Sequence, residues 1–206
     1  MKLQQIEWFA ERAPNIAMQT RAADRSALIA VEIKHRTELA QDYEIAAGSA
    51  EASMRVVRES GEYPLLSGGD INLYSLFVER AQALVHERGM IGLLTPSGIA
   101  ADKGASEFFR SISSTGRLDA LFDFENKKYF FPDVRASFKF SALIFGAPQR
   151  QFAASECAFF LHRSAELELP GRILSLSAED FNRVNPNTGA APIFRTPKDA
   201  EITMKI

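Results

Sequence analysis

The chain has 206 residues, of which 46% are hydrophobic and 24% charged, and its formal net charge is -2. These values are typical of a globular protein, and they exclude a global electrostatic attraction to nucleic acid, so any such binding must come from a local patch. The single cysteine, Cys157, excludes an internal disulfide. No apolar run reaches the roughly 20 residues that span a membrane, and no apolar signal core follows Met1. We therefore expect a cytoplasmic protein without membrane contact.

The first segment, residues 1–69, is predicted to be mainly helical. Apolar residues within 3–13 recur at helical spacing, and Pro14 is expected to end or kink that helix. The stretch 22–58 is rich in alanine and in charges of both signs, with Gly48 as a possible break between two helices. Such alternating charge favours a solvated helix face over a nucleic-acid surface.

An α/β pattern follows. A helix is predicted from Asp70, as its N-cap, to about Arg88. The apolar run Met90–Thr95 then predicts a strand buried on both faces of a parallel sheet. Asp102 is expected to cap the next helix, and Leu118–Phe124 forms the next strand.

The strand predicted at 137–146 must run antiparallel to a neighbour. About a dozen residues separate it from the preceding strand and show no helical pattern, whereas a parallel crossover usually requires a helix. Further elements are a strand at 156–162, a helix capped by Ser177, and a helix that begins at Thr196-Pro197.

Two loops should lie at the carboxyl ends of the strands, where open α/β sheets bind ligands. They are Thr95–Asp102 and Glu125–Ala136. The second combines lysines and an arginine, which can meet phosphates, with aromatic rings, which can stack on bases. The alternative, which residue types alone favour, is that Phe130 and Phe131 form a hairpin core and the lysines are solvated.

Other chemistries lack their motifs. The three histidines are scattered without metal-ligand spacing, so no metal site is predicted. The sequence also lacks a Gly-x-Ser-x-Gly elbow, a phosphate loop and a Gly-x-Gly-x-x-Gly dinucleotide fingerprint.

The order of motifs resembles the amino-methylating adenine DNA methyltransferases of restriction-modification and phage-defence systems, particularly those of type IIG. The resemblance covers nearly the whole chain. It is carried by Lys2-Leu-Gln-Gln-Ile-Glu-Trp-Phe-Ala-Glu-Arg-Ala-Pro14, Asn72-Leu-Tyr-Ser-Leu-Phe77, Gly92-Leu-Leu-Thr-Pro96, Phe131-Pro-Asp133, Lys139-Phe-Ser-Ala-Leu-Ile144, Arg183-Val-Asn-Pro-Asn-Thr-Gly189 and Pro192-Ile-Phe-Arg-Thr-Pro-Lys-Asp-Ala200.

The resemblance implies methyl transfer from S-adenosylmethionine to the exocyclic nitrogen of adenine in double-stranded DNA. By its position, Phe77 corresponds to the aromatic residue that packs on the cofactor adenine, although a sheet-facing core position is an equal alternative. Phe131 corresponds to the residue that stacks on the flipped adenine, with Phe130 as the register alternative. Four cations are then expected to hold phosphate: Lys127, Lys128, Arg135 and Lys139.

The resemblance is partial, because the glycine-rich cofactor motif, the acidic ribose-binding residue and the catalytic Asn-Pro-Pro-aromatic motif are absent. No catalytic residue is therefore assigned, and the chain alone is expected to be inactive. We expect an α/β fold with a partial Rossmann-like sheet, comprising parallel strands, a late antiparallel strand and an N-terminal helical segment.

The resemblance divides the chain into 1–69, a helical insertion after the absent catalytic motif, 70–165, the carboxyl half of the methyltransferase domain, and 166–206, a connection toward a target-recognition region. An incomplete sheet would expose an edge that invites self-association. The alternatives are a non-catalytic DNA-binding or subunit-docking module, and an unrelated α/β binding protein with its pocket after Thr95.

Overall fold

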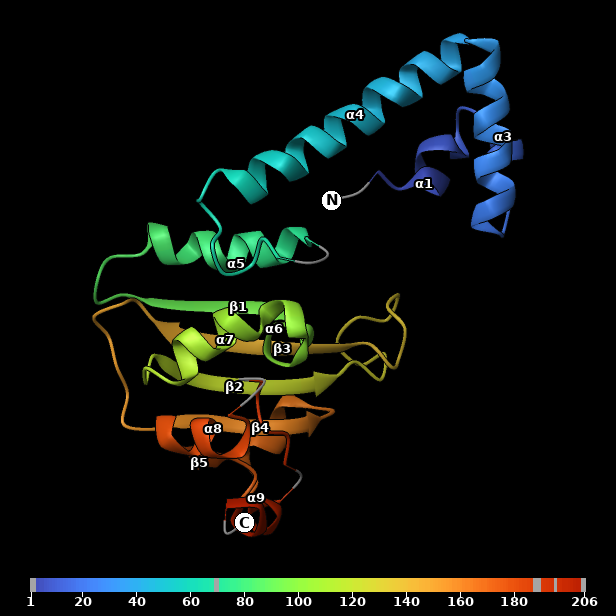
Figure 1. The fold of residues 1–206 in the computed structure, drawn as a ribbon. Coiled ribbons are helices and arrows are strands. Elements are labelled where there is room, and N and C mark those ends of the chain that lie inside the picture. Colours follow the sequence, from blue (N-terminus) through green and yellow to red (C-terminus); the bar gives the residue numbers. More distant parts are fainter. Residues whose placement is uncertain (1–2, 69–70, 187–189, 195, 205–206) are drawn as a thin grey trace. The chain divides into compact units, whose positions relative to one another are not determined.

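The computed structural model describes residues 3–68, 71–186, 190–194 and 196–204, and its contacts divide the chain into two units, Met1–Glu62 and Tyr63–Ile206. The first unit is helical, and the second contains a five-stranded mixed sheet with helices (Figure 1). The predicted α/β class with an N-terminal helical segment is confirmed, and the sheet is consistent with a partial Rossmann-like fold. In the described part of the chain, no helix is long and apolar enough to cross a membrane.

The first unit contains α1 (Gln5–Ala10), α2 (Pro14–Ala17), α3 (Ala22–His35) and α4 (Glu38–Glu59). Its core is built around the buried side chains of Phe9, Ile16 and Ile29. The rings of Trp8 and Tyr43 close this core, with an edge-to-face contact at 5.4 Å between their centroids. Apolar side chains from all four helices thus converge on one small cluster.

Two helix boundaries differ from those predicted. Pro14 begins α2 as its first residue, where the missing N–H costs nothing, and α1 already ends at Ala10. Gly48 lies inside α4, since one glycine costs a helix only about 1 kcal/mol. The break instead falls at Arg36, which has a φ of 51°, and at Thr37, whose hydroxyl oxygen accepts the Ala40 N–H at 3.1 Å.

The sheet of the second unit has the order β1-β3-β2-β4-β5. Its strands are β1 (Met90–Pro96), β2 (Leu118–Glu125), β3 (Lys139–Gly146), β4 (Ser155–Leu161) and β5 (Leu174–Leu176). β3 runs antiparallel to both β1 and β2, which confirms the antiparallel strand predicted at 137–146. β2 pairs in parallel with β4, and β4 pairs antiparallel with β5.

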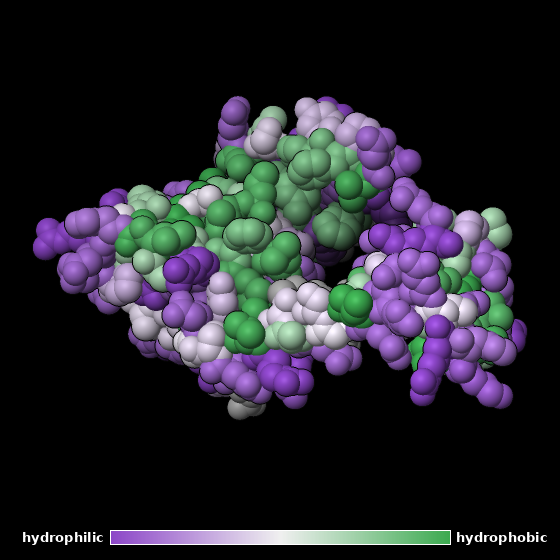
Figure 2. All heavy atoms as spheres, turned by 90° about the horizontal axis from the view of Figure 1, so that it is seen from above, coloured by the Kyte–Doolittle hydropathy of each residue, from purple (hydrophilic) through white to green (hydrophobic). Residues whose placement is uncertain are grey.

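The prediction that Met90–Thr95 is buried on both faces of a parallel sheet is wrong. Among the described residues, β1 is an edge strand that pairs only with β3, and antiparallel. Ile91 and Thr95 are buried, whereas Leu94, on the opposite face of the strand, is 67% exposed. Exposed apolar side chains also lie on α5 (Leu73–Leu84), among them Leu73 and Phe77, and Figure 2 shows apolar side chains gathered in the view from above Figure 1.

One face of the sheet is covered by helices (Figure 1). The cover includes α6 (Gly98–Ala101), η1 (Lys103–Ala105) and α7 (Ser106–Ser113), whereas α5 lies beside the β1 edge. The wholly buried side chains of Phe108, Phe109 and Ile112 on α7 join the sheet residues in one core, whose members from the strands include Leu118 and Phe145. This arrangement explains the closely spaced apolar residues on α7.

The remaining elements complete the second unit. They are η2 (Ser164–Glu168), α8 (Ala178–Val184) and α9 (Pro197–Met204). The predicted cap of α8 is confirmed, because the Ser177 hydroxyl oxygen accepts the Asp180 N–H at 3.2 Å. The predicted helix start at Thr196-Pro197 is also confirmed. The proposed roles of segments 1–69, 70–165 and 166–206 remain predictions.

Two predicted helices have different boundaries in the structure. Asp70 lies outside the described residues, and Asn72 caps α5, which ends at Leu84 instead of Arg88. Asp102 precedes η1 without a capping hydrogen bond from its side chain, because the short helix α6 comes first.

A buried carboxylate fixes the chain that leads into α5. Glu79 accepts the backbone N–H groups of Leu65 and Leu66, both at 2.8 Å. Burial raises the pKa of Glu79, and the two N–H donors partly oppose this effect by favouring the charged form. The loop 63–68 is thereby held against α5 by a side chain whose carboxyl oxygens are both occupied.

Candidate nucleic-acid interface

The two candidate loops lie at the same edge of the sheet. β1 and β2 are both antiparallel to β3, so their carboxyl ends point the same way. In register, Thr95 of β1 and Asp123 of β2 both face Ser141 of the intervening β3. The loop after β1 and the loop between β2 and β3 (Figure 1) therefore start from neighbouring positions, which is where open α/β sheets bind ligands.

A buried asparagine determines the shape of the loop 126–138. The Asn126 Nδ2 group donates to the carbonyl oxygens of Phe131 and Val134 at 2.8 and 3.0 Å. Its Oδ1 atom accepts the Phe131 N–H at 2.9 Å, and its backbone N–H donates to the Phe138 carbonyl oxygen at 2.9 Å. Asn126 is wholly buried. The carboxamide thus connects the beginning of the loop to its middle, and the backbone N–H connects it to the end.

The loop begins with two lysines in an uncommon backbone conformation. Lys127 and Lys128 have φ values of 43° and 60°, in the left-handed region that side chains other than glycine rarely adopt. This conformation costs roughly 1–2 kcal/mol per residue. The surrounding hydrogen bonds hold it, among them the Lys127 N–H to the Ala136 carbonyl oxygen at 2.8 Å.

The aromatic rings of the loop divide into a supporting set and an exposed set. The Phe130 ring contacts Phe124 and Phe140 edge-to-face, each at 5.3 Å between centroids, and is half-buried. The Phe131 ring contacts Phe140 edge-to-face at 5.2 Å between centroids, but Phe131 is 41% exposed. Tyr129 is 57% exposed. The hairpin-core alternative therefore describes Phe130, whereas Phe131 offers a surface to a ligand.

The four predicted phosphate-binding cations lie in or beside this loop. Lys127, Lys128 and Arg135 are exposed, and Lys139 begins β3 with its ammonium group 4.8 Å from the Phe160 ring centroid. Lys127 Nζ also lies 2.6 Å from the Glu125 carboxylate, and this pairing is the main reason that the pKa of Glu125 is lowered. Lys127 is thus held at the start of the loop by a neighbouring anion.

Phe77 lies on α5 and not in the aromatic loop. It is 66% exposed on α5, whereas Leu76 and Val78 on the same helix are buried. The structure therefore does not place Phe77 in the core. α5 lies beside β1, and the aromatic loop follows β2 (Figure 1).

The sequence did not indicate a buried polar group beneath the β1–α6 turn. The Asp123 carboxylate accepts hydrogen bonds from the Ser97 and Ser141 hydroxyls, the latter at 3.0 Å. Asp123 and Ser141 are buried. These bonds connect the turn after β1 to β2 and β3, so both candidate loops are attached to the same strand pair. Within the apolar run of β2, nothing in the sequence distinguished Asp123 as inward-facing.

Replacing Asn126 by alanine should loosen the loop without unfolding the unit. The variant leaves the Phe131 N–H and two loop carbonyl groups without their partner, which we expect to cost about 1–3 kcal/mol of unfolding free energy. Amide hydrogen exchange should accelerate in residues 126–138 and remain slow in β1. Asn182→Ala, at an exposed position of α8, is the matched control. Unchanged exchange in the loop would contradict the role assigned to Asn126.

One segment of the chain matches a known protein family. The model of the Eco57I restriction-modification methylase family matches residues 53–131. A solved structure titled "cryoEM structure DrdV-DNA complex" is similar with a TM-score of 0.38 and 12% identity, over 57% of this chain and 14% of that one. This chain thus spans a small part of that protein. No curated protein matches the chain. The segment from the end of α4 to Phe131 is therefore similar to restriction-modification methylases.

Proposed function

We propose that this chain is the carboxyl half of the methyltransferase domain of a site-specific DNA adenine N6-methyltransferase, acting in restriction-modification in the cytoplasm. The observation that carries the proposal is the exposed Phe131 on a loop fixed by a buried asparagine, at the carboxyl edge of a sheet whose matching segment is similar to methylases. The cations Lys127, Lys128 and Arg135 lie in the same loop, and Lys139 begins the strand that follows it.

In this role, Phe131 stacks on the target adenine. The exocyclic nitrogen of a paired base is inaccessible to an enzyme, so the base must leave the duplex, which costs a few kcal/mol. Stacking on an aromatic ring returns roughly 1–3 kcal/mol of that cost. Phe130 contributes indirectly, because it fills the space beneath the loop next to Phe140 and so supports the ring that meets the base.

S-adenosylmethionine would supply the methyl group. The described residues fit one part of this cofactor, since the exposed Phe77 ring offers an apolar face for an adenine. The glycine-rich loop, the acidic ribose-binding residue and the Asn-Pro-Pro-aromatic motif are absent from the 206 residues. We therefore infer that this chain alone does not methylate DNA and that the catalytic motif is provided by a further segment.

The open edge of β1 is where such a segment could pair. Leu94 and Met90 are exposed on β1, and Leu73 and Phe77 are exposed on α5. An unpaired, apolar strand edge recruits a further strand or a second copy of the same chain. The alternative function is a non-catalytic DNA-binding or subunit-docking module, for which the same β1 edge would be the docking surface.

Cofactor binding distinguishes the methyltransferase proposal from the non-catalytic module. In calorimetry with S-adenosylmethionine, we expect binding by a longer polypeptide that carries the Asn-Pro-Pro-aromatic half upstream, and none by this chain alone. Phe77→Ala in the longer form should weaken binding about tenfold, which corresponds to about 1.4 kcal/mol. Leu84→Ala removes another exposed side chain from α5 and should have no effect. Binding by neither form would favour the non-catalytic module.

Stacking can be tested on this chain with a fluorescent single-stranded oligo-adenylate, whose bases need no flipping. Phe131→Ala should weaken its binding about 5- to 160-fold, because roughly 1–3 kcal/mol of stacking is lost. Phe152→Ala is the control, since this half-buried ring precedes β4 at the opposite end of the sheet. An equal loss in both variants would show that Phe131 does not contact the base.

The exposed edge of β1 should allow this chain to self-associate. Light scattering of this chain should show a mass that rises with concentration, and Leu94→Lys should reduce that rise because a charge on an edge strand opposes pairing. Leu169→Lys changes a similarly exposed leucine outside the strands and is the control. A monomer at all concentrations would exclude the edge as a self-pairing surface.

A further inference from the structure

The carboxyl end of β4 extends the edge that carries the aromatic loop. β4 is parallel to β2, so the turn that follows it, residues 162–166, emerges on the same side of the sheet as the loop 126–138. This turn lies beyond residues 53–131, the segment similar to restriction-modification methylases. Its contacts nevertheless join it to that segment.

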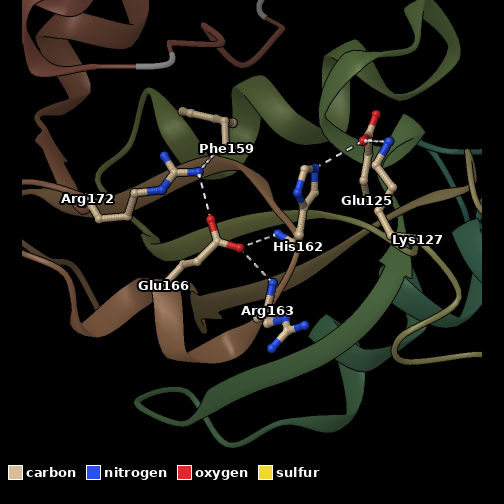
Figure 3. A network of polar contacts seen from close by, with 7 residues as sticks. All are labelled: Glu125, Lys127, Phe159, His162, Arg163, Glu166 and Arg172. Carbon is tan, nitrogen blue, oxygen red and sulfur yellow. Dashed lines mark hydrogen bonds and ion pairs between the residues drawn. The ribbon is translucent and has the colours of Figure 1, made fainter.

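Two side-chain contacts join the turn to that segment, and a third joins strands β3 and β4. The Arg163 guanidinium carbon lies 5.1 Å from the centroid of the exposed Tyr129 ring. The His162 Nε2 atom lies 3.2 Å from the Glu125 carboxylate (Figure 3). Lys139 Nζ lies over the ring of Phe160, in β4. The turn and the loop therefore form one continuous surface.

The backbone of the turn is fixed, whereas the Arg163 side chain is exposed. Glu166 Oε1 accepts the N–H groups of both His162 and Arg163 at 2.8 Å, and its other oxygen lies 3.9 Å from Arg172 (Figure 3). In Figure 3 the Arg163 guanidinium points away from Glu166. The Arg163 guanidinium lies over the Tyr129 ring and the residue is exposed, so a ligand can reach this group from solvent.

A strained residue directs the chain into this turn. Phe160 has a φ of 56°, and the pairing of β2 with β4 shifts register between Phe122 and Phe124. Such bulges re-aim side chains and are common beside functional sites. A hollow of about 420 Å³ lies here, lined by Glu125, Phe159, Phe160, His162 and Arg172.

The charge of this surface favours an anion. Two of its carboxylates are already engaged, Glu125 by Lys127 and His162, and Glu166 by Arg172 and two N–H groups, while Asp133 in the loop is outnumbered by Lys127, Lys128, Arg135 and Arg163. An arginine held over an aromatic ring keeps its planar set of donors available for a phosphate, and it loses little side-chain freedom on binding.

We propose that Arg163, supported by Tyr129, is a phosphate-binding subsite for the backbone of the DNA whose target base stacks on Phe131. This inference rests on the proposed function and adds a second point of attachment, on the turn after β4. The ligand is a phosphodiester of duplex DNA, bound without regard to sequence.

The test is fluorescence anisotropy of a labelled duplex of arbitrary sequence with the full chain over a series of salt concentrations. Arg163→Ala should weaken binding several-fold at low salt and reduce the slope of log affinity against log salt by about 0.9, the value for one lost phosphate contact. Arg163→Lys should retain most of the slope, because it keeps the charge. Tyr129→Ala should weaken binding but lower the slope less than Arg163→Ala does, because it removes no charge.

Arg183→Ala is the matched control, since Arg183 is an exposed arginine on α8 paired with Glu179 at 2.9 Å. It should leave the slope unchanged. An unchanged slope in Arg163→Ala, in a protein whose oligo-adenylate binding still depends on Phe131, would overturn this inference and leave the proposed function intact. Absence of duplex binding by the unmodified chain, together with an oligo-adenylate affinity unaffected by Phe131→Ala, would overturn both.

Discussion

Strand β3 forms hydrogen bonds along both of its edges, with β1 on one side and β2 on the other. Because it runs against both neighbours, β1 and β2 are forced to end at the same edge of the sheet. The turn after β1, the aromatic loop after β2 and, through the parallel β4, the turn around Arg163 all emerge there. The antiparallel strand thus gathers three loops that are widely separated in the sequence.

The sequence predicts these strands well because each is a short apolar run between turn residues. The antiparallel direction of β3 also follows from sequence, since the connection before it has no crossover helix. The edge position of β1 does not follow. A run such as Met90–Thr95 is apolar when helices cover both faces of the strand. It is equally apolar when one face is left exposed, so composition alone cannot distinguish the two cases.

At the candidate site, the sequence identified the loop but not which ring it exposes. Phe130 and Phe131 are adjacent and chemically identical, and they differ only in tertiary contacts: Phe130 packs on Phe124 and Phe140, while Asn126 holds the Phe131 backbone. Asp123 and Arg163 were not predicted because their partners are distant in the chain: Ser97 and Ser141 for the first, Tyr129 for the second. Such pairs exist only after the strand order is set.

The two lysines with positive φ have a consequence for how this loop can change. Glycine would adopt both backbone angles without steric cost, so substituting glycine at Lys127 or Lys128 relieves strain. The same substitution removes a positive charge from the surface that faces the phosphates in our proposal. A glycine at either position therefore exchanges the phosphate affinity of our proposal for a less strained backbone.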